Sequence, residues 1–184
     1  MVNVNIVTTE DGETPLIVAS RNGDFQTVCN LMKNNNLDDV NLPDGIGCTA
    51  FYYASTRNHF EVVRELLKHP NIDVNLRAGE YKITPHLYAA IKNHFKTVQE
   101  LLKHPNIDAD IRASFGKTPL YCASCEDHYR VVRELLKNKK VDVHIKRICG
   151  RTTQFFILAF VVLCLSVSQI YVRKVGSCSV HQPP

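Results

Sequence analysis

The chain has 184 residues, of which 45% are hydrophobic and 22% are charged, proportions that are ordinary for a folded protein. Residues 1–142 hold 17 Lys/Arg and all 18 Asp/Glu, so this part carries almost no net charge. A nucleic-acid binder would have a basic excess in its folded part, and its absence argues against binding to nucleic acid. The other five basic residues follow residue 142.

The seven cysteines are odd in number and scattered through the chain. The sequence contains no Asn-x-Ser/Thr glycosylation site, and its first 15 residues lack the apolar core of a signal peptide. Together these features favour a reducing compartment, where thiols stay free. We therefore expect a cytoplasmic protein, or one that faces the cytosol from a membrane.

A period of 34 to 35 residues runs through the sequence. Threonine recurs at Thr14, Thr49, Thr84, Thr118 and Thr152, at spacings of 35, 35, 34 and 34 residues. Apolar pairs keep the same spacing, and they are Leu31-Met32, Leu66-Leu67, Leu101-Leu102 and Leu135-Leu136. Because independent features move in step, the sequence predicts internal repeats of the kind that stack into solenoids.

The first unit, residues 9–43, shows the local structure expected of each repeat. Thr14 and Pro15 predict the start of a helix, because threonine caps free backbone N–H groups and proline at the first helical position loses no hydrogen bond. Gly23 predicts a left-handed turn. The equivalent turn residues are Asn58, Asn93 and Asp127. A second helix is expected through Phe25–Met32, where apolar residues recur at helical spacing.

The same pattern returns in residues 44–78, 79–112 and 113–146, after a short lead-in of residues 1–8. No single unit of this size could bury its own apolar face, but stacked units share one core. We therefore predict an all-α fold, a solenoid of about four helix-turn-helix units with hairpin loops, followed by a C-terminal hydrophobic helix.

The motifs of these units resemble the ankyrin repeat closely. The family's Gly-x-Thr-Pro-Leu motif stands at residues 12–16 and 116–120. Its Val-Val-x-x-Leu-Leu motif stands at residues 62–67 and 131–136. The resemblance covers roughly residues 9–146.

Three residues depart from the family pattern. Ala50, Lys82 and His86 stand where the family has proline, glycine and leucine, and they predict looser packing in the second and third repeats. The resemblance implies a scaffold or adaptor that binds another protein and carries no catalytic activity.

The resemblance also implies a contact surface, formed by the hairpin loops, or fingers, and by the inner face of the first helices. In this sequence the corresponding finger residues are Asp11, Ile46, Tyr81 and Phe115. Equivalent positions line up in stacked repeats, so the last three should form an apolar stripe, here called the finger stripe, and such stripes often mark binding sites. The residues expected around it are Glu80, Ile83, Ser114 and Lys117 on the fingers, with Arg57, Lys92 and Glu126 on the first helices.

Several residue groups that could carry chemistry fit the repeat pattern better. Gly116-Lys117-Thr118 matches the end of a phosphate-binding loop, but Ile111 stands where that loop needs a glycine. Cys122 and Cys125 have metal-ligand spacing, yet a closed zinc site needs four ligands and no second pair exists. Five of the eight histidines recur at equivalent repeat positions, which do not converge on one point. We therefore expect no enzyme, no cofactor and no metal site.

Residues 147–184 begin a fifth repeat that then fails. Phe155–Val172 is a run of 18 uncharged residues, and a helix needs about 17–25 mostly apolar residues to cross a bilayer. We consider three interpretations: a transmembrane anchor, a hydrophobic helix that caps the last repeat, and an aberrant end without an evolved role. A short basic and polar tail follows.

The sequence therefore predicts a protein–protein interaction module that is monomeric and binds another protein. If Phe155–Val172 is an anchor, the module is tethered to a membrane and the repeats stay in the cytosol. The alternative is a truncated fragment of a longer ankyrin array with no independent binding role.

Overall fold

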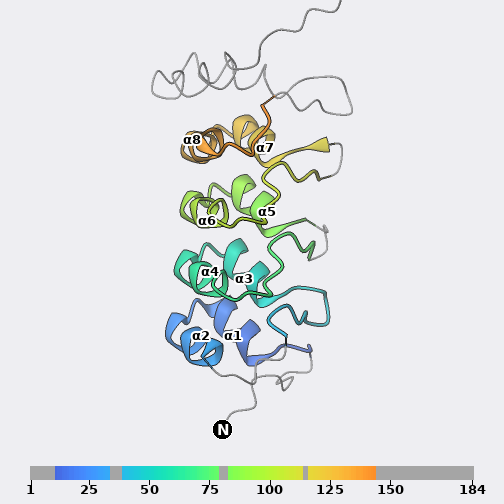
Figure 1. The fold of residues 1–184 in the computed structure, drawn as a ribbon. Helices are drawn as coiled ribbons and strands as arrows, with labels where there is room; N and C mark the ends of the chain where they lie inside the picture. Colours follow the sequence, from blue (N-terminus) through green and yellow to red (C-terminus); the bar gives the residue numbers. More distant parts are fainter. Residues whose placement is uncertain (1–10, 34–38, 79–82, 114–115, 144–184) are drawn as a thin grey trace, which may run out of the picture.

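The computed structural model describes residues 11–33, 39–78, 83–113 and 116–143, and its regular elements in these ranges are eight short helices. They form four pairs: α1 (Pro15–Asn22) with α2 (Phe25–Met32), α3 (Ala50–Thr56) with α4 (Phe60–Leu66), α5 (Pro85–Ile91) with α6 (Phe95–Leu101), and α7 (Pro119–Cys125) with α8 (Tyr129–Lys137). The pairs stack in one column (Figure 1), which confirms the predicted all-α solenoid.

The column has two rows of helices and one row of fingers (Figure 1). The odd-numbered helices form the inner row, next to the fingers, and the even-numbered helices form the outer row. None of these eight helices is long and apolar enough to cross a membrane. The hydrophobic segment 155–172, for which a helix was predicted, lies outside the described residues.

Each inner helix begins with the threonine cap that the sequence predicts. The Thr14 side-chain oxygen accepts a hydrogen bond from the Ile17 N–H at 3.3 Å. Thr49, Thr84 and Thr118 make the same bond at 3.1, 3.3 and 3.2 Å. The turn residues are left-handed as expected, with φ angles of 73°, 62°, 59° and 55° at Gly23, Asn58, Asn93 and Asp127. Each helix pair therefore has its start and its turn set by local sequence.

One continuous apolar core runs along the stack between the two rows. The small residues of the inner helices are buried, among them Ala54, Ala89 and Ala123 at 0% exposure, so neighbouring helices can approach closely. Leu66 and Leu101 of the outer row are also fully buried. Each pair therefore completes the core of its neighbours, as expected for a solenoid.

Asparagine side chains clamp each repeat to the next. Asn41 donates to the Asn71 carbonyl oxygen at 2.7 Å and accepts from the Asp73 N–H at 2.8 Å. Asn75 makes the equivalent two bonds one repeat later, at 2.7 and 2.9 Å. At the third junction Asp110 accepts from the next repeat's backbone at 2.7 Å. These bonds satisfy backbone groups that the loops would otherwise leave open.

The recurring histidines form a second set of links. A ring nitrogen of His59 lies 3.2 Å from the Arg21 carbonyl oxygen, at the end of the preceding inner helix. His94 and His128 make the equivalent contacts at 3.3 and 3.1 Å. Their periodic spacing therefore reflects a structural role at each junction.

His86 is a buried polar residue at a core position, whose equivalents are Leu16, Phe51 and Leu120. Its imidazole is 0% exposed, and neither ring nitrogen makes a hydrogen bond of normal geometry in the described part of the chain, although the Asp108 backbone is close enough to interact with it. Burial lowers the pKa of His86 from 6.5 to about 4, with partial opposition from the Asp108 backbone. Ala50, the other described departure from the family pattern, is 1% exposed.

His86 should make the fold sensitive to acid. Its pKa is lower in the folded state, so the unfolded state binds more protons and stability falls as the pH drops from about 6.5 to 4. For a shift of this size the loss is about 3 kcal/mol. We expect His86→Leu to remove this acid-induced loss of about 3 kcal/mol. The variant should also gain about 1–2 kcal/mol of stability at pH 7, because it no longer buries a polar ring. Urea denaturation at pH 7 and pH 4 measures both effects.

Leu120→His is the matched control, because it places histidine at the equivalent core position of the fourth repeat. It should increase the acid sensitivity that His86→Leu reduces. If the stability of His86→Leu depends on pH as strongly as that of the unaltered chain, His86 is not the cause of the acid sensitivity.

Basic residues of the outer helices lie over aromatic rings of the preceding repeat. The Lys96 ammonium lies 4.5 Å from the Phe60 ring centroid. The Arg130 guanidinium lies 5.4 Å from the Phe95 ring centroid. At the first junction Glu61 stands at the equivalent position, and Phe25 is 42% exposed. The row of cation–π contacts is therefore interrupted there.

Glu61→Lys should extend this row to the Phe25 ring. We expect a gain of about 0.5–1 kcal/mol in the free energy of unfolding, because a cation placed over a phenyl face is attracted to it. Thermal or urea denaturation measures the gain. Glu61→Gln is the control that removes the negative charge without adding a cation, and equal stability of the two variants would contradict the prediction.

Candidate functional site

Of the three residues of the finger stripe, only Ile46 lies within the residues that the structure describes. Ile46 lies at the tip of the second finger with 68% of its side chain exposed. Tyr81 and Phe115 lie outside the described residues, as do the neighbouring Glu80 and Ser114. The stripe as a whole stays a prediction.

The predicted surrounding residues on the inner helices occupy one repeated position. Arg57, Lys92 and Glu126 directly follow α3, α5 and α7, and all three are exposed. On the fingers Lys117 is exposed, whereas Ile83 is half-buried. Ile83 packs against a small cluster beside the main core, formed by Leu87, Tyr121 and Cys122. Much of the Ile83 side chain is therefore used for packing.

A cleft of about 570 Å³ opens between the first two fingers and the inner helices α1 and α3. Its side chains include Asp11, Glu13, Arg21, Asp44, Ile46 and Tyr53, and we call it the first-junction cleft. The Gly45 N–H donates to the Asp11 carbonyl oxygen at 2.9 Å and joins the two fingers. A Cβ atom on Gly45 would lie 3.0 Å from that oxygen, so the close approach favours glycine.

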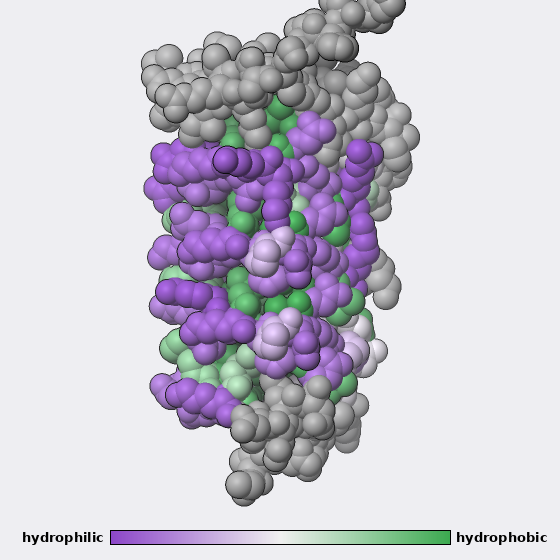
Figure 2. Space-filling model, in the orientation of Figure 1, coloured by the Kyte–Doolittle hydropathy of each residue, from purple (hydrophilic) through white to green (hydrophobic). Residues whose placement is uncertain are grey.

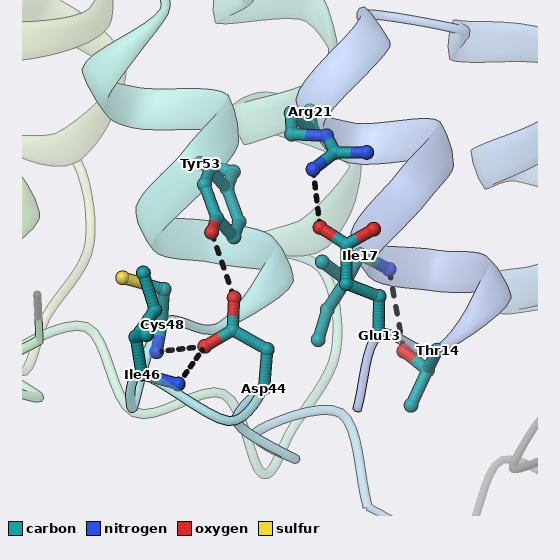
Figure 3. A network of polar contacts seen from close by, with 8 residues as sticks. All are labelled: Glu13, Thr14, Ile17, Arg21, Asp44, Ile46, Cys48 and Tyr53. Carbon is teal, nitrogen blue, oxygen red and sulfur yellow. Dashed lines mark hydrogen bonds and ion pairs between the residues drawn. The ribbon is translucent and has the colours of Figure 1, made fainter. Parts of the chain in front are cut away.

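Asp44 organises the second finger (Figure 3). One carboxylate oxygen accepts from the N–H groups of Ile46 and Cys48 at 3.0 and 2.8 Å. The other accepts from the Tyr53 hydroxyl at 2.7 Å. Burial and the bond to Asp44 raise the pKa of Tyr53, so its hydroxyl stays protonated and donates. The finger is therefore fixed to α3.

Glu13 and Arg21 form an ion pair on the opposite wall (Figure 3). Glu13 is 4% exposed, and Arg21 lies on the last turn of α1. The same guanidinium carbon lies 5.9 Å from the Tyr53 ring centroid. Arg21 therefore lies between a carboxylate of the first repeat and an aromatic ring of the second.

The cleft is acidic. It contains the carboxylates of Asp11, Glu13 and Asp44 and the single guanidinium of Arg21, which leaves two negative charges. Asp11 is exposed at the rim, whereas Glu13 and Asp44 are buried at 4% and 9% exposure. A charge in such a partly enclosed cleft acts more strongly on a ligand than one on an open surface.

The charged residues that line the cleft with Tyr53 and Ile46 do not repeat along the chain. Glu13 is replaced in later repeats by Cys48, Ile83 and Lys117. Arg21 is replaced by Thr56, Ile91 and Cys125. Asp44 is replaced by Ala78 and Ala113. The caps and clamps recur because the scaffold needs them, so these singular side chains belong to the first junction alone.

Sequence reasoning identified Ile46 but missed the four polar residues Glu13, Arg21, Asp44 and Tyr53 that line the cleft with it. A signal for three of them was present, because a column-by-column comparison of the repeats shows Arg21 and Asp44 at positions that are uncharged elsewhere, and Glu13 at a position where no other repeat has an acid. Their mutual contacts could not be read from that comparison.

A second hollow, of about 270 Å³, lies on the outer side between α4 and α6. Its basic residues include Lys68 and Lys103, which are paired with Glu65 and Glu100. On the outer-helix side Figure 2 shows mostly hydrophilic residues, with weakly apolar patches between them. We therefore take the first-junction cleft as the candidate site.

Within the described ranges, no three His, Cys, Asp or Glu side chains are placed to hold a metal ion. In the cleft, Asp44 already accepts three hydrogen bonds and Glu13 is paired with Arg21. The arrangement provides charge, an aromatic wall and an exposed apolar tip at Ile46. These are features of a binding surface.

Comparisons with known proteins agree with the architecture. A search of curated proteins found no match. A crystal structure of the ankyrin repeat protein EF0377 is similar, with a TM-score of 0.73 and 26% sequence identity, over 94% of this chain and 85% of that one. The family model described as ankyrin repeats (3 copies) matches residues 1–78 and 77–147. The chain therefore belongs to the ankyrin-repeat family.

Proposed function

We propose that this chain is a protein-binding scaffold that contacts its partner through the fingers and the inner helices. Ankyrin repeats are generally protein–protein interaction modules, and proteins built from them are typically not enzymes. The observation that carries the proposal is Ile46, 68% exposed at a fingertip beside the first-junction cleft. Protein interfaces gain most of their binding energy from a few side chains that become buried in the complex, and an exposed apolar residue at a fingertip is placed to be buried in this way.

Truncating the finger stripe should weaken partner binding and leave the fold intact. We expect the combined variant Ile46→Ala, Tyr81→Ala and Phe115→Ala to bind its partner at least about tenfold more weakly, because apolar anchors contribute over about 1 kcal/mol each. Its thermal midpoint should change little. Quantitative co-precipitation and a melting curve measure the two effects.

Tyr129→Ala is the matched control, because Tyr129 is 50% exposed on the outer helix α8. It should bind the partner normally. A large fall in the melting temperature of the combined variant would instead assign the stripe to the core. Equal loss of binding in the Tyr129 variant would place the interface on the outer row. The fragment alternative predicts that the unaltered chain has no saturable partner at all.

We propose that the repeats lie in the cytosol or face it. In the described ranges Cys29, Cys48, Cys122 and Cys125 form no disulfide bond, and Cys125 is exposed. Cysteines outside disulfides are typical of a reducing compartment.

Membrane tethering through residues 155–172 is a separate proposal that rests on their 18 uncharged side chains. We expect the full-length chain to stay with membranes during alkaline-carbonate extraction and a version ending at Arg151 to be released. Release of both would reject the anchor. Unequal melting curves of the two soluble versions would then favour a cap, and equal curves an aberrant end.

A further inference from the structure

The first-junction cleft has room for side chains of a bound protein. Its volume of about 570 Å³ lies within the range of roughly 300–1,000 Å³ typical of ligand-binding clefts. It opens between the first two fingers, and the exposed Ile46 is one of its lining residues. A partner that contacts the fingers would therefore meet this cleft.

The net negative charge of the cleft favours basic ligands over acidic ones. Three carboxylates face one guanidinium, so an acidic side chain would be repelled and a basic one attracted. Asp11 is exposed at the rim, and a cation bound there would keep part of its hydration. Asp11 is therefore the carboxylate that a ligand can contact directly, whereas the buried Asp44 already accepts three hydrogen bonds and attracts a cation through its field.

The cleft already holds one guanidinium in a defined way. Arg21 is paired with the Glu13 carboxylate and lies 5.9 Å from the centroid of the Tyr53 ring. Carboxylate pairing combined with an aromatic face is a favourable environment for guanidinium and ammonium groups. The position of Arg21 thus shows that the walls of the cleft accommodate a guanidinium group.

We propose that the first-junction cleft receives an arginine or lysine side chain of the partner protein, with an adjacent apolar residue packed on Ile46. The proposal rests on the proposed function, because it assigns partner chemistry to the same finger side. The basic head group lies near Asp11 and Asp44, and its aliphatic stem lies along the cleft wall. Because Glu13, Arg21 and Asp44 have no counterparts in later repeats, this preference is confined to the first two fingers.

A selection from a phage library of random 12-residue peptides on the full-length chain tests this chemistry. We expect enrichment of peptides with Arg or Lys next to Leu, Ile or Phe, and weaker binding as salt is raised from 0.05 to 0.5 M. Replacing the selected arginine by citrulline, a neutral isostere, should weaken binding about tenfold. Fluorescence polarisation with the synthetic peptides measures these changes.

Two charge reversals locate the site. Asp11→Lys acts at the exposed rim, and we expect it to weaken peptide binding about threefold to tenfold. Glu61→Lys makes the same change of charge on the outer helix α4, and it should leave binding unchanged. Asp44→Asn is a second cleft variant, used if its melting curve matches that of the unaltered chain.

Three results would overturn the proposal. Enriched peptides without basic residues that still lose affinity in Ile46→Ala would reject the basic side chain and leave the proposed function in place. Equal effects of Asp11→Lys and Glu61→Lys would show general electrostatic attraction instead of a site. Failure to enrich any peptide, together with normal partner binding by the finger-stripe variant, would reject both proposals.

Discussion

A pair of helices seven to nine residues long has too little interior to fold alone, and the whole structure depends on this constraint. Each pair leaves one side of its apolar face open, and only the next pair covers it. The Asn41 and Asn75 clamps and the contacts of His59, His94 and His128 fix the distance between repeats. Stability therefore resides at the junctions, and the repeated residues are those that a junction requires.

This constraint separates two kinds of position. At positions that face a neighbouring repeat few residue types are tolerated, because a poorly packed side chain there disturbs two repeats at once. Fingertip residues such as Ile46 face solvent and can differ between repeats. Glu13 and Asp44 also differ from their later equivalents, although both are buried, because Arg21 and Tyr53 of the first junction pair with them. His86 departs from this pattern within the scaffold, since it places a buried polar ring where Leu16 and Leu120 are apolar. Through this ring the third repeat gains a dependence on pH.

Most of the fold could be predicted from the sequence because its determinants are local. Thr14 caps the helix that follows it, and Asn58 adopts the left-handed turn that its side chain tolerates, so both could be located without knowing the stacking. The finger stripe was assigned by alignment of equivalent positions, and only Ile46 of it is described. The domain limits likewise stay predictions.

The cleft could not be predicted in the same way. Asp44 and Tyr53 are nine residues apart, and their bond depends on how the second finger folds back on α3. Arg21 lies near Tyr53 only because two repeats stack at a particular distance. Charges at unusual repeat positions were visible in the sequence, but their convergence is a property of the assembled junction.

The cleft is built entirely from side chains between Asp11 and Tyr53, and the contacts that form it stay within the first two repeats. In a solenoid, folding can start at one junction and spread to the next, without waiting for distant segments. On the ribosome these two repeats are made before the third and fourth and before residues 155–172. The first-junction cleft therefore belongs to the part of this chain that is synthesised first, and the third repeat is the next one needed to cover the open face of the second.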